Sequence, residues 1–431
     1  MQRRYQTLVQ QQFSAAQPVA AGLRPVPGAT QTFAATQAAW RFYKNPTVAL
    51  NQLAHPLLQR ARTALAYHTR SYALVLHDWS LLHYNGHHAR QDRIALSQKT
   101  DLGYTLQSAL LISDRDGSPL APVFQGLEAA DGVHSSQSGC VEPPLSRLDA
   151  LAPVMAFIGQ LGWDKTPVHL IDAEADSVGH FRHWHRAGYR FLVRADGVNH
   201  VQHRGQDRSL EQVRQILRQQ RRFRKARWVD FEGRRVRQWV AQATVTLVRP
   251  ARLGRQGQRT KLRGEPLTLR LVVTELRDSK GNVPACWFLL TNVSAGVDAA
   301  TIALWYYWRW EIESYYKLLK GAGLQLEHWQ QETADAVARR LLVASMACVL
   351  VWQLACSRAP AAAALRTFLV RLSGRQMRRG CAFTLPALLA GLWVYLTMRA
   401  ALEHYDLLAI ERNLDEILTE PRDETPGEVF V

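Results

Sequence analysis

Residues 72–79, Tyr-Ala-Leu-Val-Leu-His-Asp-Trp, form an apolar run that ends in an acidic residue. Such a run predicts a buried strand with Asp78 near its carboxyl end. Residues 168–172, Val-His-Leu-Ile-Asp, repeat the pattern and give Asp172 the equivalent place. In sheets with helices on both faces, ligand-binding residues gather at this edge. An Asp at a strand end is also a common turn former, so a structural role stays open for either residue alone.

The rest of the chain predicts an α/β fold, in which a mixed sheet carries helices on its faces. Further strands are expected at residues 104–112, 120–124, 189–194, 239–248, 267–275 and 287–291. Helices are expected at residues 36–67, 145–161, 177–187 and 299–321, and again beyond 326. The most apolar run, 341–355, is shorter than the roughly 20 residues of a spanning helix, so it is expected to be a buried helix.

The predicted helix 299–321 places one carboxylate among cations. At about 100° per residue, one arc of about 80° holds Tyr306, Arg309, Glu313, Lys317 and Lys320. The opposite side carries large apolar residues and is expected to pack against the core. A carboxylate among cations is often only a solvated network of ion pairs, and that alternative remains open for this helix taken by itself.

Three carboxylates from two strand ends and a helix nevertheless suggest a metal site. Magnesium prefers hard oxygen ligands and is commonly held by a few carboxylates together with phosphate oxygens. Two such ions can activate the attacking oxygen and stabilise the leaving oxygen of a phosphoryl displacement. We therefore expect Asp78, Asp172 and Glu313 to be the ligands of two Mg²⁺ ions, with Mn²⁺ as a substitute.

The composition favours a polyanionic partner. The chain has 431 residues, 47% of them hydrophobic, and a formal net charge of +17. A protein this basic usually meets nucleic acid, or less often a membrane surface. Its five cysteines form no CxxC pair, so neither a zinc site nor a disulfide framework is expected. This usage fits a reducing, cytoplasmic setting.

Several other polar residues are further site candidates. The Arg-rich stretch 214–237 is expected to contact phosphates, with a solvated helix face as the alternative. His87 and His88 follow the turn dipeptide Asn85-Gly86 and are expected to be exposed loop residues. Structural roles are expected for three further acidic residues near loops, Asp164, Asp196 and Asp298.

One motif resembles a known family. The spacing Tyr306-x2-Arg309-x3-Glu313-x6-Lys320 matches the YREK motif of bacterial cut-and-paste DDE transposases of insertion-sequence family four. The surrounding string RWEIESYYKLLKGAG resembles the catalytic helix of that family. The segment from Trp40, WRFYKNPTVALNQLAHPLL, resembles its N-terminal region.

The two aspartates lie in segments that resemble the other motifs of this family. Asp78-Trp-Ser80 resembles the first-Asp motif, and residues 172–176, Asp-Ala-Glu-Ala-Asp, resemble the second, usually written DREAD. Ala173 departs from that pattern, because the family usually has Arg there. Glu174 and Asp176 could support the site, and capping of the following helix is the equal alternative for Asp176.

The resemblance implies a ribonuclease-H-like core in which Asp78, Asp172 and Glu313 bind the metal. It further implies that DNA is contacted by Tyr306, Arg309, Lys317, Lys320 and Trp287. In relatives, the Trp at the place of Trp287 stacks on a flipped base during hairpin formation, and such stacking is worth about 1–3 kcal/mol. A core position on a buried strand is the alternative for this Trp.

The predicted organisation has five parts. They are a helical DNA-binding region (1–70), the first part of the core (71–198), a basic β-rich insertion (199–285), the core completion with the catalytic helix (286–330), and a helical C-terminal region (331–431). The last part is the candidate for dimer contacts, and an acidic, disordered tail is expected at its end.

The function expected from this sequence is DNA transposition. The enzyme would bind the inverted repeats at the ends of its element, act as an endonuclease there, and transfer the strands to target DNA as a homodimer. A cytoplasmic, nucleoid-associated location and no membrane association are expected. The alternatives are a ribonuclease-H-like nuclease without strand transfer and a catalytically silent DNA-binding protein derived from a transposase.

Overall fold

The computed structural model describes residues 2–14, 29–172, 177–249, 264–321, 323–404 and 406–419. Ala173, Glu174 and Asp176 lie outside these described residues. So does the end of the predicted acidic tail, from residue 420 onward.

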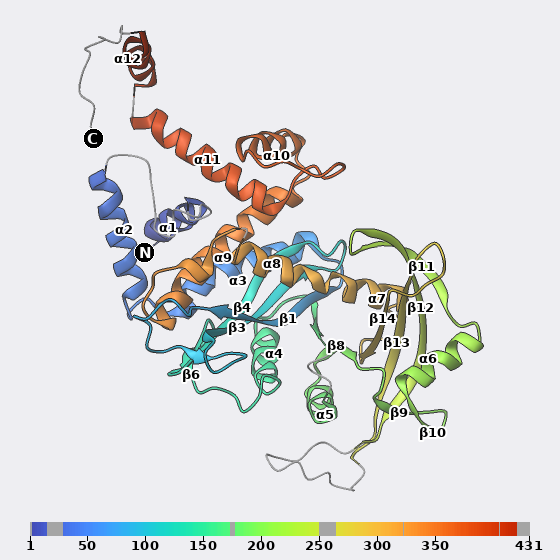
Figure 1. The fold of residues 1–431 in the computed structure, drawn as a ribbon. Helices are drawn as coiled ribbons and strands as arrows, with labels where there is room; N and C mark the ends of the chain where they lie inside the picture. The colour runs from blue at the N-terminus through green and yellow to red at the C-terminus, as the bar shows by residue number, and fades with distance from the viewer. Residues whose placement is uncertain are drawn as a thin grey trace, which may run out of the picture.

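The architecture is a mixed α/β fold built on one large sheet, as expected (Figure 1). At the centre, β1 (Tyr72–His83) runs parallel to β7 (Thr166–Ile171) and antiparallel to β3 (Leu102–Ser113). The strand β8 (Arg190–Ala195) continues parallel to β7 on its other side. Residues Ala73–Leu76 of β1 are fully buried, which is typical of a strand covered on both faces.

The remaining strands extend this centre in both directions. The described part of the sheet has 14 strands, and its main path runs β10-β9-β12-β13-β14-β8-β7-β1-β3-β4-β5-β6. On one side of the centre lie β2 (Ile94–Ala95), β4 (Pro119–Ala129), β5 (Gly132–Ser135) and β6 (Gly139–Val141). On the other lie β9 (His200–His203), β10 (Gln206–Ser209), β11 (Arg224–Phe231), β12 (Arg234–Leu247), β13 (Leu267–Arg277) and β14 (Ala285–Thr291). The predicted insertion therefore continues the core sheet through backbone pairing, because β14 joins β13 to β8.

Helices cover both faces of the sheet (Figure 1). One face carries α3 (Leu50–His68), α7 (Ala299–Tyr307), α8 (Glu311–Leu319) and α9 (Ala334–Cys356). The other carries α4 (Leu151–Gln160), α5 (Val178–Arg186) and α6 (Leu210–Gln219). At the ends of the chain are α1 (Gln2–Ser14), α2 (Ala29–Lys44), α10 (Pro360–Leu372), α11 (Leu385–His404) and α12 (Leu407–Thr419). Two groups of buried side chains, one mainly on each face, form the core.

The apolar run 341–355 lies within α9, a helix that is buried on nearly all sides. An apolar surface all the way round is typical of a central core helix. Thr333 caps its first turn by accepting a hydrogen bond from the Ala336 amide. No single helix among the described residues is long and apolar enough to cross a membrane, although α9 and α10 together pass that test as a pair bent by 118°.

Three predicted helices have different boundaries in the structure. The predicted helix 36–67 is divided into α2 and α3 by a turn around Pro46, and the one expected at 145–161 begins only at Leu151. The predicted helix 299–321 is interrupted at Trp308–Trp310 by one turn of 3-10 helix, η2. A 3-10 turn tightens the backbone and changes the direction of the side chains that follow it.

Candidate active site

The three predicted acids meet at one place. Asp78 lies on β1, Asp172 directly follows β7, and Glu313 lies on α8. The strands β1 and β7 pair only as far as His77 and Ile171, so both aspartates stand where this pairing ends. The helix α8 packs against β1 and brings Glu313 to the same point.

A single guanidinium contacts all three carboxylates. Nη2 of Arg309 lies 2.7 Å from Oδ2 of Asp172 and 3.3 Å from Oε1 of Glu313. Nη1 of the same residue lies 3.3 Å from Oδ2 of Asp78. Arg309 lies in η2, and its side chain is only 7% exposed. One buried cation therefore contacts three acids that are far apart in the sequence.

The carboxylates are partly buried, which changes their acidity. Burial raises the pKa of the Asp78 carboxyl above its usual value, and nearby Asp172 adds to this shift while Arg309 opposes it. The pKa of Glu313 is raised in the same way, by burial first, with Asp78 and Asp172 contributing and Arg309 opposing. Like charges gathered in a poorly solvated place disfavour ionisation, and a bound cation relieves this penalty.

Asp172 has two further partners. The Tyr306 hydroxyl donates a hydrogen bond of 3.0 Å to its Oδ1. Nε of Arg194, on β8, lies 2.8 Å from the same oxygen. Arg194 was not predicted from the sequence as a site residue. Its place beside Asp172 follows from the parallel pairing of Ile171 with Val193, which puts the next residues, 172 and 194, side by side.

The helix α8 is fixed to β1 through backbone carbonyls. The Tyr316 hydroxyl, also not singled out in the sequence, donates to the Asp78 carbonyl oxygen at 2.8 Å. Nζ of Lys320 donates to the Leu81 carbonyl oxygen at 2.7 Å and lies 3.2 Å from Glu327. In this conformation Lys320 therefore positions the helix. Lys317 is exposed, and it lines an open hollow of about 610 Å³ beside Glu313.

Trp287 is buried, in agreement with the alternative that it is a core residue on a strand. Its side chain is 6% exposed and packs edge-on against Tyr306, with ring centroids 5.5 Å apart. The ring centroid of Phe231 lies 6.4 Å from that of Trp287. Stacking on a base, which stays a prediction, would require the Trp287 ring to become accessible.

The other candidates lie outside the acid cluster. Asp298 caps α7 by accepting a hydrogen bond from the Thr301 amide, and Asp196 accepts one from the Val198 amide in a turn. Both contacts agree with the expected structural roles. His87 lies in the turn that follows β1.

The Arg-rich segment divides into two groups. Arg214 and Arg218 bind the fully buried carboxylate of Glu275, so these two arginines attach α6 to the sheet. A second group lies on one face of β11, β12 and β13, where cationic and aromatic side chains alternate, and Arg277 connects it to the first group because it also binds Glu275. We call it the Arg–Trp face, and it consists of Lys225, Trp228, Arg235, Arg237, Trp239 and Arg277.

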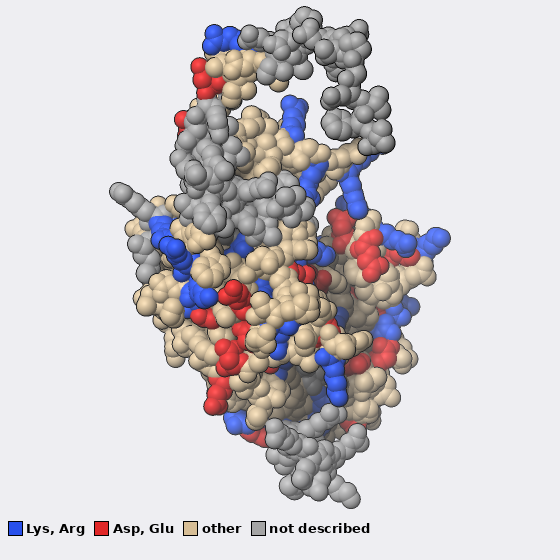
Figure 2. Space-filling model, turned by 60° about the vertical axis from the view of Figure 1, so that its left-hand side comes forward, with Lys and Arg blue, Asp and Glu red and all other residues tan. Residues whose placement is uncertain are grey.

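Positive charge is also distributed elsewhere on the molecule. Figure 2 shows Lys and Arg side chains spread over the visible face and interspersed with Asp and Glu, rather than gathered in one patch. The net charge of +17 is therefore not explained by a single basic surface on that side.

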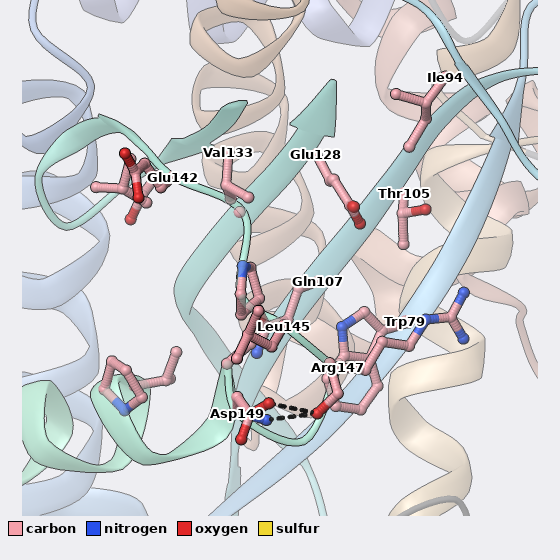
Figure 3. A pocket seen from close by; sticks show the side chains of 18 of the residues that line it. Trp79, Ile94, Thr105, Gln107, Glu128, Val133, Glu142, Leu145, Arg147 and Asp149 are labelled. Carbon is pink, nitrogen blue, oxygen red and sulfur yellow. Dashed lines mark hydrogen bonds between the residues drawn. The ribbon is translucent and has the colours of Figure 1, made fainter. Parts of the chain in front are cut away.

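A separate cavity of about 750 Å³ lies over β1, β3, β4 and β5 (Figure 3). Two of its floor residues, Trp79 and Gln107, are direct partners on β1 and β3. Because side chains alternate along a strand, Trp79 projects from the face of β1 opposite to Asp78. Leu145 and Arg147 belong to the loop that borders the cavity (Figure 3). None of the three acids lines it, so this cavity is distinct from the acid cluster.

Comparisons with known proteins give one family match and one structural match. The family model described as "Transposase DDE domain" matches residues 144–350, a stretch that includes Asp172 and Glu313 and begins after Asp78. No curated protein matches the sequence. Among solved structures, a match is found to a piggyBac transposase synaptic complex with hairpin DNA, at 10% identity and a TM-score of 0.30. The match covers 84% of this chain, which spans 59% of the length of that one.

Proposed function

We propose that this protein is a DNA transposase that cleaves DNA at the ends of its element and joins those ends to target DNA. The observation that carries the proposal is the contact of one guanidinium with Asp78, Asp172 and Glu313. It is supported by the match of residues 144–350 to the transposase DDE domain. The finer assignment, to the YREK group of insertion-sequence family four, rests on the spacing of Tyr306, Arg309, Glu313 and Lys320.

The donor set fits divalent metal ions. Three carboxylates are the hard oxygen ligands that Mg²⁺ prefers. Among the described residues no group of three or more His, Cys, Asp or Glu side chains is arranged to hold an ion, and Arg309 lies between the carboxylates. We propose that Asp78, Asp172 and Glu313 hold two Mg²⁺ ions, which Mn²⁺ can replace. When bound, such ions activate the attacking oxygen and stabilise the leaving one.

The reaction needs no covalent protein intermediate. Water attacks a phosphodiester at the end of the element, a new P–O bond forms, and the bond to the 3′ oxygen breaks to release a 3′-hydroxyl. That hydroxyl then attacks another phosphodiester, where a new P–O bond forms and the existing bond to a 3′ oxygen breaks, and the family resemblance implies a hairpin intermediate. The protein contributes mainly positioning and electrostatic stabilisation. Tyr306 and Arg194 orient Asp172, while Lys317 and the Arg–Trp face are placed to contact phosphates.

The proposed organisation keeps the predicted parts. These are a ribonuclease-H-like core (71–198 and 286–330), a basic insertion (199–285), a helical N-terminal DNA-binding region (1–70) and a C-terminal region (331–431). A homodimer is proposed because two ends must be held at once. The exposed apolar side chains of Met398, Leu402 and Leu408 in the C-terminal region support a contact there. The proposed location is the bacterial cytoplasm, at the nucleoid.

Strand cleavage of end-containing DNA in the presence of Mg²⁺ tests the proposal. Glu313→Gln and Asp172→Asn should each reduce cleavage by several orders of magnitude while DNA binding is retained, because only the metal ligands change. Asp164→Asn, at an exposed acid that pairs with Lys165, is the matched control and should cleave normally. Cleavage retained in both site variants would refute the assignment.

Two other functions remain distinguishable by experiment. A nuclease without strand transfer would cleave the same DNA but would not join its ends to a target plasmid. A silent DNA-binding protein would bind and do neither. The intact cluster of three acids favours the two catalytic functions over the third.

A further inference from the structure

Arg309 occupies the position that a shared metal ion would need. It contacts Oδ2 of Asp78, Oδ2 of Asp172 and Oε1 of Glu313, and its side chain is nearly buried. The contact distances of 2.7–3.3 Å belong to ion pairs and hydrogen bonds. Mg²⁺ binds oxygen at about 2.0–2.1 Å, so the three carboxylates must close in when an ion enters.

The guanidinium and the metal exclude each other for reasons of space and charge. The same carboxylate oxygens would serve both, and two cations side by side among them would repel each other. Removing Arg309 without a replacement would leave three carboxylates together in a partly buried place, which is strongly unfavourable. Arg309 therefore stabilises the site only as long as metal is absent.

The residues around Arg309 would allow its side chain to turn away from the three acids. It lies in η2, and 3-10 turns within helices often mark hinges. The next residue, Trp310, is 47% exposed, and its ring centroid is 5.9 Å from Cζ of Arg309. This contact is present while Arg309 pairs with the acids, and a cation–π contact of this kind can continue to hold the guanidinium as it turns outward. The open hollow beside Glu313 gives a DNA backbone access to the same area.

We propose that Arg309 is an internal counter-ion that holds the three acids together before metal binds, and that metal displaces it toward a DNA phosphate. This inference rests on the proposed function, because it takes the acids to be metal ligands. Arg309 pairs with the carboxylates in one state and with phosphate in the other, so metal and DNA each favour the same displaced state. Thermodynamic linkage then requires each to strengthen binding of the other.

Binding of Mn²⁺ to the full-length protein without DNA, followed by the electron paramagnetic resonance of unbound Mn²⁺, tests the exchange. Arg309→Gln should bind Mn²⁺ more tightly than the wild type, on the order of tenfold, because the competing cation is gone. Arg309→Lys should be intermediate, since an ammonium keeps the charge but contacts fewer carboxylates. Arg194→Ala is the matched control, because among the described residues the ion pair of Arg194 is with Asp172 and with neither of the other two acids.

Each outcome of this titration supports or overturns the displacement of Arg309 by metal. A gain for Arg309→Gln well above that of Arg194→Ala supports displacement. Equal gains would overturn it, since they would reflect only the loss of one nearby positive charge. Absence of binding to wild type, Arg309→Gln and Asp172→Asn alike would overturn the metal site itself, and so separates failure of the proposed function from failure of the exchange.

Thermal unfolding and DNA binding give two independent readouts. Without metal, Arg309→Gln should melt below the wild type, and Mn²⁺ should restore more of its stability than it adds to the wild type. With a short fluorescent duplex, Ca²⁺ should raise the affinity of the wild type several-fold more than that of Arg309→Gln. An equal Ca²⁺ effect in both proteins would overturn the phosphate half of the proposal.

Discussion

Trp287 shows how burial decides what a single side chain is expected to do. The sequence left base stacking and a core position open, and the structure places the indole in contact with Tyr306 and near Phe231. Trp287→Ala should therefore destabilise the fold by roughly 3–5 kcal/mol, as large-to-small changes in cores do. Urea unfolding measures this loss.

The exposed Trp228 provides the control for that measurement. Its side chain is 48% exposed, so Trp228→Ala should change the free energy of unfolding by no more than about 0.5 kcal/mol. A Trp287→Ala protein that is as stable as the wild type but fails to form hairpins would contradict the core role and favour base stacking.

The sequence predicted which side chains of the site lie close together, but not which of them form ion pairs with one another. The convergence of Asp78, Asp172 and Glu313 was expected from two strand ends and a helix face. The contact of Arg309 with all three acids was not, because it depends on the 3-10 turn that redirects this side chain. Arg194 was missed for a similar reason, since its place depends on the pairing of β7 with β8.

The end of α8 depends on a close backbone approach at Gly323. A Cβ on this residue would lie 1.8 Å from the Leu318 carbonyl oxygen, which already accepts a hydrogen bond from the Leu324 amide. Gly323→Ala should therefore cost roughly 1–3 kcal/mol of stability, because backbone must shift. Gly321→Ala is the control, since its Cβ would meet nothing within 4 Å. Equal melting temperatures for the two variants would contradict this account.

The contact between β5 and α9 should depend on pH. Burial lowers the pKa of His134, but hydrogen bonds to Asp335 on α9 and to Asp131 outweigh it, so the net pKa is raised. Charged His134 therefore adds stability at pH values below its unfolded pKa, and this contribution is lost as pH rises through its folded pKa. His134→Gln should lower the melting temperature by roughly 2–4 °C at pH 5.5 and by less at pH 8.5. Equal losses at both pH values would exclude the charge contribution.

Elements with strong local patterns were predicted best. The strand expected at 168–172 is confirmed as β7. The strand expected at 72–79 is also present, but it continues to His83, so the expectation that Asp78 lies near its carboxyl end was wrong. The pairing of residues 78–83 with β3 extends β1 beyond the apolar run. The break at Pro46 and the late start of α4 are boundary effects, which depend on tertiary contacts as much as on local preference. The joining of the insertion to the core through β14 is a pairing between distant segments, and the local pattern does not encode it.

The net charge of +17 predicts a strong salt dependence of DNA binding. Each Lys or Arg that neutralises a phosphate contributes about 0.9 to the slope of log K against log salt. Replacing Arg235 and Arg237 of the Arg–Trp face by Ala should lower that slope by about two. Arg358→Ala, a 91% exposed residue paired with Asp116, should leave it unchanged. Fluorescence anisotropy over a salt series measures the slope, and an unaltered slope in the double variant would exclude this face from DNA binding.

The central place of β7 has a consequence for amide hydrogen exchange. This strand is paired on both sides, with β1 and β8, whereas Glu313 is supplied by a helix interrupted at η2. Amides in β7 and its two neighbours should exchange with deuterium only through global unfolding, while those around η2 should exchange through smaller local openings. The distance between Asp78 and Asp172 would then stay constant over long times. Any rearrangement of the three acids would come from movement of the helix that carries Glu313.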